Sequence, residues 1–407
     1  MKIIYIHQYF LTPEEGGAIR SYHLAKGMVD AGIAVEMITS HNEPTYDIRL
    51  VDGIKVHYLP ISYDNNFGFL RRVYSFLGFV RAAKRLIKKL PRPDYLYITS
   101  TPLTTGIIGR WAKKKLALPY FFEVRDLWPE APIQMGVIRN WMVKKFLYRL
   151  ERQIYQDAFH IVALSPSIGE SIERTCPNRS VTIIPNFSDP DFFDPAIVSE
   201  KMRLDPIGFD QITITYAGAI GPVNGLGAFL DLAKKAKDNG LNWKFILMGK
   251  GVEVPGILRE KQRMGLDNLY VRPFGNKYEV RDLLAISDFI YLSFLPHPVL
   301  TTSSPNKFFD AIAMGKPIIL NFKGWIHEHV IQSDIGIYHE EGNTDSVVEY
   351  INKVYRNAAL KQAIQQRSRA LACSRFSKKQ ALKILLGILK AKKPKRGKAS
   401  GVYTLTA

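Results

Sequence analysis

Short apolar runs alternate with longer stretches of helical periodicity along almost the whole chain. Tyr, Ile, Val and Phe dominate the short runs, and few runs alternate strictly between apolar and polar positions. Runs that are apolar on both sides are typical of parallel strands covered by helices on both faces. The pattern therefore predicts an α/β fold of doubly wound sheets. Strands are expected at residues 2–7, 35–39, 54–58, 94–99, 120–124, 160–164, 212–217, 244–249, 269–273, 289–294, 317–321 and 336–339. Helices are expected at residues 17–31, 71–90, 137–156, 226–239, 306–314 and 344–357.

A break in this pattern near residue 190 predicts two domains. Residues 185–195 contain three prolines and three aspartates, and a new strand–helix series starts at Ile212. The chain has 407 residues, whereas single cores stop growing at about 250–300 residues. We predict Rossmann-like domains at 1–190 and 191–375, joined at 186–210, with ligands bound in the cleft between them. An amphipathic helix at 376–390, a candidate for crossing back to the first domain, and a disordered basic tail at 391–407 complete the prediction.

Composition narrows the class of partner. The 56 Lys and Arg residues outnumber the 37 Asp and Glu residues, which gives a net charge of +19 and predicts an anionic partner. No recognition helix, RRM or zinc signature is present, so we expect no nucleic acid. Two cysteines exclude a disulfide framework and fit a reducing compartment. Without a recognisable signal peptide or spanning segment, the protein is expected in the cytoplasm or on a membrane surface.

Two glycine loops follow predicted strands. Gly16 and Gly17 precede the first helix, and Gly218 and Gly221 follow the first strand of the second domain, with Lys250 after the next strand. Such loops let backbone N–H groups and a helix N-terminus approach phosphate oxygens. Neither G-x-G-x-x-G nor a P-loop motif occurs, which argues against a nicotinamide enzyme and a P-loop NTPase. Plain turns between strand and helix are the alternative.

The segment Glu123-Val-Arg-Asp-Leu-Trp-Pro-Glu130 is a candidate catalytic segment. It lies at the end of the strand predicted at 120–124, where catalytic groups usually lie in this architecture. Its four charged residues and one tryptophan in eight positions favour a functional site. A strand end held together by salt bridges is the alternative.

The segment from Thr301 to Pro317 is the most specific motif. Ser304 is a natural N-cap and Pro305 a natural first residue of a helix, whose N–H groups can face a phosphate. Lys307 places a cation near that end, which is unfavourable unless an anion is bound. Asp310 stands in apolar surroundings and needs hydroxyl donors, which a ribose offers. A capped helix with an exposed Asp310 is the alternative.

The first half of the chain contains a long basic stretch and two short stretches that combine Trp with Lys. Residues 71–90 hold seven Lys and Arg residues and no acid, and residues 111–115 and 141–145 combine Trp with Lys. This pattern fits a helix lying on acidic lipid. A helix packed on the sheet with a charged outer face is an equal alternative.

In this order, the motifs resemble the GT-B fold glycosyltransferases of family four, from Met1 to about Arg375. Gly16, Gly17 and Arg20 match that family's opening loop, and Ser304-Pro-Asn-Lys-Phe-Phe-Asp310 with Ala313-Met-Gly-Lys-Pro317 resembles its donor-binding signature. Arg125-Asp-Leu-Trp-Pro129 looks most like the WbuB-type branch, N-acetylfucosaminyl-type transferases of O-antigen and capsule assembly. The chain departs from the family's paired glutamates, where it has Thr302 and Asp310, and from the basic residues usual near Ile220 and Asn224.

The resemblance implies a retaining transfer from a UDP-sugar, with an N-acetylated sugar expected, to an undecaprenyl-diphosphate-linked saccharide. It implies no metal or other cofactor, and a peripheral location on the anionic inner face of the plasma membrane. The implied catalytic residues are Asp126, Arg125 and Glu130, with Asp126 orienting the acceptor hydroxyl or acting as base. The implied donor-binding residues are Gly17, Gly218, Gly221, Asn224, Lys250, Ser303, Ser304, Asn306, Lys307 and Asp310. The implied acceptor-binding residues are Gly16, Arg20, Glu123 and Trp128. A nucleotide-sugar epimerase of the same fold and a non-catalytic sugar-nucleotide-binding subunit are the alternatives.

Overall fold

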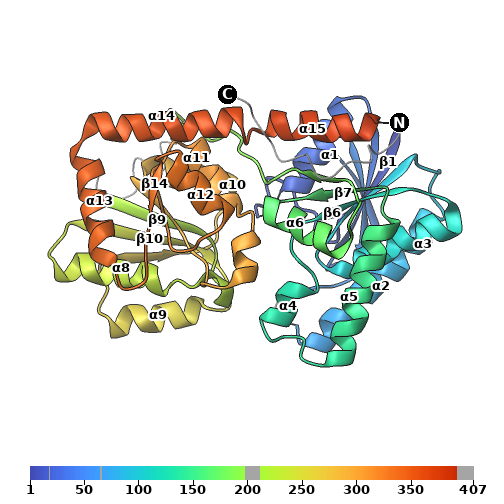
Figure 1. Ribbon diagram of the computed structural model, residues 1–407, viewed down its shortest axis with the longest axis horizontal. Coiled ribbons are helices and arrows are strands. Elements are labelled where there is room, and N and C mark those ends of the chain that lie inside the picture. The colour runs from blue at the N-terminus through green and yellow to red at the C-terminus, as the bar shows by residue number, and fades with distance from the viewer. Residues whose placement is uncertain (18, 65–66, 198–210, 392–407) are drawn as a thin grey trace.

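Two α/β domains lie side by side in the computed structural model, each built around one twisted sheet (Figure 1). The structure describes residues 1–17, 19–64, 67–197 and 211–391. Residues 198–210 of the predicted linker and 392–407 of the predicted tail lie outside the described residues. The prediction of two parallel-sheet, Rossmann-like domains is confirmed.

The first sheet has eight strands in the order β3-β4-β2-β1-β5-β6-β7-β8, and its pairs are parallel except for β3 with β4. Six strands were predicted. The sequence pattern missed β3, which is an exposed edge strand, and β8, which has only three residues. The strands are β1 Lys2–Ile6, β2 Ala34–His41, β3 Asp47–Val51, β4 Ile54–Pro60, β5 Tyr95–Thr99, β6 Tyr120–Val124, β7 His160–Ala163 and β8 Val181–Ile183.

Helices cover both faces of this sheet, because the strands are apolar on both sides. In β1, Ile4 and Ile6 pack into one core cluster, whereas Ile3 and Tyr5 pack into the cluster on the other face. The helices are α1 Arg20–Asp30, α2 Phe69–Ile87, α3 Gly106–Leu116, α4 Glu130–Gln134, α5 Trp141–Asp157 and α6 Pro166–Thr175, with the 3-10 turn η1 Leu103–Thr105.

The second sheet has six parallel strands in the order β11-β10-β9-β12-β13-β14. Its strands are β9 Ile212–Ala219, β10 Trp243–Lys250, β11 Leu269–Arg272, β12 Phe289–Leu292, β13 Ile318–Leu320 and β14 Gly336–Tyr338. The helices around it are α8 Gly227–Asp238, α9 Val254–Arg263, α10 Lys277–Ile286, α11 Asn306–Ala313, α12 Trp325–Gln332 and α13 Thr344–Arg356, with the turns η2 Pro222–Asn224 and η3 Pro298–Thr302.

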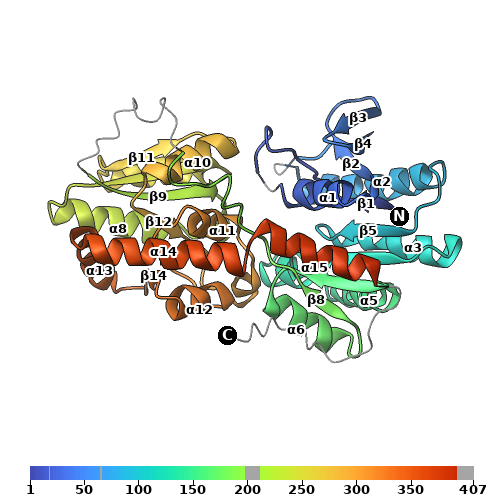
Figure 2. The same cartoon turned by 90° about the horizontal axis from the view of Figure 1, so that it is seen from above.

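The last two helices connect the domains. Figure 2 shows α14 (Ala358–Ser374) lying along the second domain and α15 (Lys378–Lys390) lying along the first. Between them the chain pairs with the linker, because Ser188 N–H donates to Phe376 O and Lys378 N–H donates to Ser188 O. The apolar face of α15 joins the core on α1, where Leu382 packs directly against Gly27.

Candidate active site

The carboxyl edges of the two sheets meet between the domains. The loop after β1 reaches the second domain, since a Cβ added to Gly16 would lie only 3.3 Å from Asn276 Cα, before α10. Gly16 has a φ of +73°, which a residue with a side chain rarely adopts. Ser165 Oγ, before α6, donates to Thr302 O at 2.7 Å. The loop that contains Gly16 and the segment that contains Thr302 therefore both lie at the predicted cleft between the domains.

A cavity of about 380 Å³ lies at this junction. It is bounded by α1, by the linker after β8, by the start of α10 and by α11. Asn306 and Asp310, one helical turn apart on α11, both line it, as does Lys277 of α10. The cavity thus brings two of the predicted donor-binding residues together with a cation that the sequence analysis did not name.

Asp310 is buried, with only 8% of its surface exposed, and it forms an ion pair with Lys277. The Lys277 Nζ to Asp310 Oδ2 distance is 2.7 Å. Burial raises the pKa of Asp310, while the Lys277 charge opposes this shift. The Asn276 capping box, in which Glu279 bonds back to the cap, begins α10 and orients Lys277. That capping box was the sequence signal that would have identified this position.

Lys307 and Gly218 lie against each other across the second domain. Lys307 Nζ donates to Tyr216 Oη at 2.6 Å and lies 3.9 Å from the centre of the Tyr216 ring. A Cβ at Gly218 would lie 3.2 Å from Lys307 Cε, and Gly218 has a φ of +154°. Burial lowers the pKa of Lys307 to about 7. Two residues predicted for diphosphate binding, Gly218 and Lys307, are therefore in contact at the carboxyl end of β9. A bound anion would favour the charged ammonium form of Lys307.

Two other residues predicted to contact the donor, Lys250 and Asn224, differ in their exposure. Lys250, at the end of β10, is exposed and lies 4.1 Å from the centre of the Phe274 ring. Gly221 N–H donates to Asn224 Oδ1 at 3.1 Å, and Asn224 is only 4% exposed. The prediction that Asn224 contacts the donor is therefore corrected, because its amide stabilises the loop from within.

The start of α11 differs from the prediction. The helix begins at Asn306 with Pro305 as its N-cap, so Ser304 is not the cap. Ser304 Oγ instead accepts from Asn186 N–H at 3.1 Å, and Asn186 Nδ2 donates to Ser304 O at 2.6 Å. Ser303 O accepts from Trp325 Nε1 at 2.8 Å. The linker takes the hydroxyl that was expected to cap the helix, and so it holds the predicted donor loop in place.

Arg20 and Glu123 form an internal ion pair. Their side chains are 1% and 0% exposed, and Arg20 Nη2 lies 3.1 Å from Glu123 Oε2. Arg20 also donates to Ile184 O and Pro185 O, and Tyr97 Oη donates to Glu123 Oε2 at 2.7 Å. The acceptor-binding prediction for Glu123 is therefore corrected, whereas that for Arg20, which also lines the inter-domain cavity, stays a prediction. The pair attaches α1 to β6 and to the linker.

Arg125 and Asp126 follow β6 at the edge of the cleft. Arg125 Nη1 donates to His7 Nε2 at 3.3 Å, and His7 Nδ1 bonds Ser21 Oγ at 2.8 Å. Burial and the Arg125 charge hold the pKa of His7 well below its usual range, so the imidazole stays neutral and orients Arg125. Asp126 is exposed and accepts from Thr101 Oγ1 at 3.2 Å.

Glu130 does not join this pair. It lies in α4, where one carboxylate oxygen accepts from Gln134 and the other accepts from Tyr148 Oη of α5 at 2.5 Å. The catalytic prediction for Glu130 is corrected, because one of its oxygens is held within α4 by Gln134 and the other connects α4 with α5. Trp128 is partly buried against the core of the first domain, and Gly17 is exposed beside Leu11.

Two family models match the chain. Residues 15–186 match the glycosyl transferase 4-like domain, and residues 211–357 match the glycosyl transferases group 1 family. This chain is a GT-B glycosyltransferase. The lipopolysaccharide 1,2-N-acetylglucosaminetransferase of Salmonella typhimurium is 22% identical over 92% of the chain and 94% of that protein.

Solved structures share the fold of this glycosyltransferase. The sucrose-phosphate synthase of Thermosynechococcus elongatus superposes with a TM-score of 0.77 at 14% identity, over 95% of this chain and 98% of that one. Anabaena HepE in complex with UDP and glucose gives a TM-score of 0.68 at 17% identity, over 96% and 100% of the two chains.

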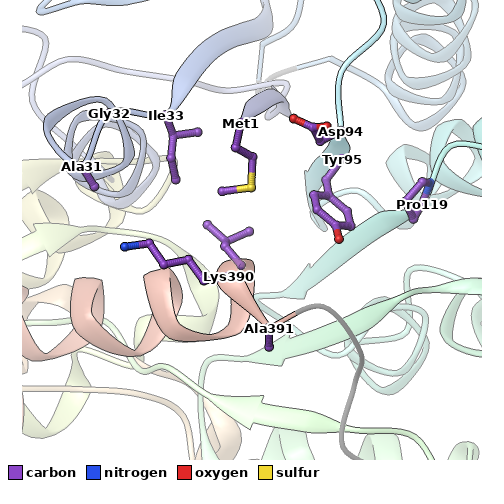
Figure 3. A pocket seen from close by; sticks show the side chains of 10 residues that line it. Met1, Ala31, Gly32, Ile33, Asp94, Tyr95, Pro119, Lys390 and Ala391 are labelled. Atoms are coloured by element: carbon purple, nitrogen blue, oxygen red, sulfur yellow. The ribbon is translucent and has the colours of Figure 1, made fainter.

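A hollow of about 580 Å³ lies at the opposite edge of the first sheet of this glycosyltransferase. Figure 3 shows Met1 and Tyr95 facing Lys390 and Ala391 at the end of α15. Met1 and Tyr95 stand at the amino ends of their strands, away from the edge where ligands bind in this architecture. We therefore place the candidate active site at the inter-domain cavity.

Within the described ranges, no group of three or more His, Cys, Asp or Glu side chains is arranged to hold a metal ion. Metal independence of the glycosyltransferase stays a prediction. None of the helices in the described part of the chain combines the length and apolar character that crossing a bilayer requires.

Proposed function

We propose that this glycosyltransferase transfers a sugar from a UDP-sugar to a lipid-linked saccharide during lipopolysaccharide-type polysaccharide assembly. The observation that carries the proposal is the meeting of Lys307 with Gly218 at the end of β9, beside a cavity lined by Asp310. Two comparisons support it: the Salmonella relative is named as a lipopolysaccharide N-acetylglucosaminetransferase, and HepE is described with UDP-glucose.

The donor would bind mainly to the second domain. Asp310 would accept hydrogen bonds from the ribose hydroxyls, and the first N–H groups of α11 with Lys307 would bind the diphosphate. As the bond to the sugar breaks, negative charge grows on the leaving UDP. Lys307 in its ammonium form and the N–H groups near Gly218 would stabilise that charge in a site shielded from water.

The acceptor would bind to the first domain next to Asp126. The carboxylate of Asp126 is exposed, and the neutral His7 holds the neighbouring Arg125 in place. We assign Asp126 to orienting the acceptor hydroxyl or accepting its proton, and we expect the anomeric configuration to be retained. Trp128 and Gly16 are proposed as further acceptor contacts.

The finer identity of the substrates is part of the proposal. We expect an N-acetylated donor sugar, as in the WbuB-type branch, and an undecaprenyl-diphosphate-linked acceptor in the anionic inner leaflet of the plasma membrane. Each Lys or Arg near such a surface contributes about 1 kcal/mol of attraction. We expect the enzyme to be peripheral on this cytoplasmic face.

The test is incubation with a panel of UDP- and GDP-sugars, with and without a lipid-linked saccharide acceptor. Transfer from one UDP-sugar, only with acceptor present and with chelator added, is the expected result. Conversion of the donor into its epimer without acceptor would replace the proposal with the epimerase alternative. If the protein binds UDP but neither transfers nor epimerises the sugar of any donor, a non-catalytic subunit would be favoured.

A further inference from the structure

Two helices of the first domain expose an unusual number of large apolar side chains near their N-termini. In α2, Leu70 is 82% and Tyr74 is 81% exposed. In α5, Trp141 is 68% and Phe146 is 64% exposed. Further exposed members are Phe69 and Leu77 of α2 and Met142, Val143 and Tyr148 of α5. Water does not favour such side chains, so a cluster of them indicates a surface that is covered in use.

Within these two helices, the charges near the exposed apolar side chains have one sign, although Glu130 of α4 accepts a hydrogen bond from Tyr148. The sequence of α2 contains no acid, and its first turns carry Arg71 and Arg72. The first ten residues of α5 also contain no acid and include Lys144, Lys145 and Arg149. Aromatic and aliphatic side chains mixed with cations are the composition of helices that lie in the interface of an anionic bilayer.

The topology places these residues on the side of the active site. A helix that follows a parallel strand and precedes the next one runs back along the sheet, so it starts near the carboxyl edge. Both α2, after β4, and α5, after β6, therefore present their N-terminal turns toward the edge that carries Asp126. Figure 1 shows α2, α4 and α5 together at the lower end of the first domain. The bond between Tyr148 and Glu130 links α5 to α4, the short helix that follows Asp126 in the chain.

We propose that the α2–α5 surface, defined by Phe69, Leu70, Tyr74, Leu77, Trp141, Met142, Val143 and Phe146, inserts into the interface of an anionic phospholipid bilayer. This rests on the proposed function, because the surface would bring the cleft to a lipid-linked acceptor. Apolar insertion anchors the protein, and the neighbouring cations select anionic headgroups. Residues 111–115, the other predicted Trp–Lys stretch, are left out of this surface, because Trp111 of α3 is partly buried with Lys84 and Lys88 over its ring.

The experiment compares three full-length proteins in sedimentation with vesicles of phosphatidylethanolamine and phosphatidylglycerol. The test variant combines Leu70→Ser, Tyr74→Ser, Trp141→Ser and Phe146→Ser. The matched control combines Leu50→Ser, Val252→Ser, Leu258→Ser and Tyr270→Ser, which remove exposed apolar side chains outside the α2–α5 surface. Each is measured at low salt and at about 1 M salt, where the Debye length falls to about 3 Å.

The test variant should partition into vesicles at least about tenfold less than the other two proteins. At high salt, the wild type and the control should keep part of their binding while the test variant loses all of it. Equal partitioning of all three proteins would overturn the proposal, as would a wild type that does not bind vesicles. Concentration-dependent dimers lost only in the test variant, without lipid binding, would instead make the surface a protein interface.

Failure of this proposal can be told from failure of the proposed function. Affinity for UDP and transfer to a water-soluble, short-chain acceptor need no bilayer, so both should be unchanged in the test variant. If transfer is intact and vesicle binding is unaffected by the substitutions, only the docking surface is wrong. If no protein transfers sugar to any acceptor, the proposed function is wrong whatever the vesicles show.

Discussion

Lys277 and Asp310 form an ion pair across two helices of the second domain, with 2.7 Å between Lys277 Nζ and Asp310 Oδ2. The pair lines the inter-domain cavity, and each side chain is 12% exposed. A buried carboxylate stays ionised when a cation compensates for its lost hydration. Lys277 therefore opposes the rise that burial imposes on the pKa of Asp310, and it favours the charged acceptor that hydroxyl donors of a ribose would bind.

Replacing Asp310 with Ala should weaken binding of UDP by about tenfold to a hundredfold. Hydrogen bonds to a charged group contribute about 1.5–3 kcal/mol, and 1.4 kcal/mol is a factor of about ten. Isothermal titration calorimetry with UDP and with its 2′,3′-dideoxy analogue measures this. The wild type should prefer UDP, whereas the variant should bind both ligands equally.

The matched control for that measurement is Asp189→Ala. Asp189 lines the same cavity but pairs with Lys378 of α15, so UDP affinity should change little. Unchanged affinity in Asp310→Ala would reject the ribose role, and an equal loss in both variants would show that the cavity as a whole was disturbed.

Binding of UDP should take up a proton above pH 7, because burial lowers the pKa of Lys307 to about 7. Above this pH the free lysine is mostly neutral, and a bound diphosphate favours the ammonium form. Affinity should therefore fall as the pH rises from 7.5 to 9, by at most about tenfold per pH unit. Calorimetry in buffers of different ionisation enthalpy measures the proton directly.

The control for this pH dependence is Lys307→Arg, whose guanidinium stays charged throughout this range. The variant should bind UDP with an affinity that does not depend on pH. A wild type that binds UDP equally at pH 7.5 and pH 9, without proton uptake, would contradict contact between Lys307 and the diphosphate.

Asp126→Asn should lower kcat for transfer by a factor of about a hundred or more while leaving UDP affinity unchanged, since general base groups contribute about 10²–10⁴ in rate. Glu130→Gln is the comparison, because it changes a neighbouring carboxylate that bonds Tyr148 and Gln134. We expect a loss below about tenfold there. Similar losses in the two variants would restore Glu130 as a catalytic residue.

Glu123→Gln should destabilise the protein by about 3–5 kcal/mol, because it leaves Arg20 buried without its counter-charge. The control is Asp238→Asn, which breaks an exposed pair with Lys234 and should cost less than about 1 kcal/mol. Urea denaturation followed by circular dichroism compares them. A stable Glu123→Gln protein with weakened acceptor binding would reinstate the acceptor role of Glu123.

Much of the fold was predictable because its signals are local. The runs that form β1 and β6 are apolar apart from Lys2 and Glu123, and a parallel sheet covered by helices on both faces buries such runs. The edge strand β3 lacked such a signal, since Leu50 and Ile48 are exposed. Asp310 and Lys307 were identified because a charged residue in apolar company, or a cation at a helix start, is unusual by itself.

The sequence alone determined the class of fold, and it predicted a break between the two domains and a motif for the donor side. These follow from periodicity and from the chemistry of single segments, which need no knowledge of partners. The tertiary structure alone decided which polar groups are free to act. In the folded chain, Arg20 pairs with Glu123, Ser304 accepts a hydrogen bond from Asn186, and Glu130 accepts one from Tyr148. Those partners are 18 to 118 residues away along the chain, and only packing brings them within hydrogen-bond distance.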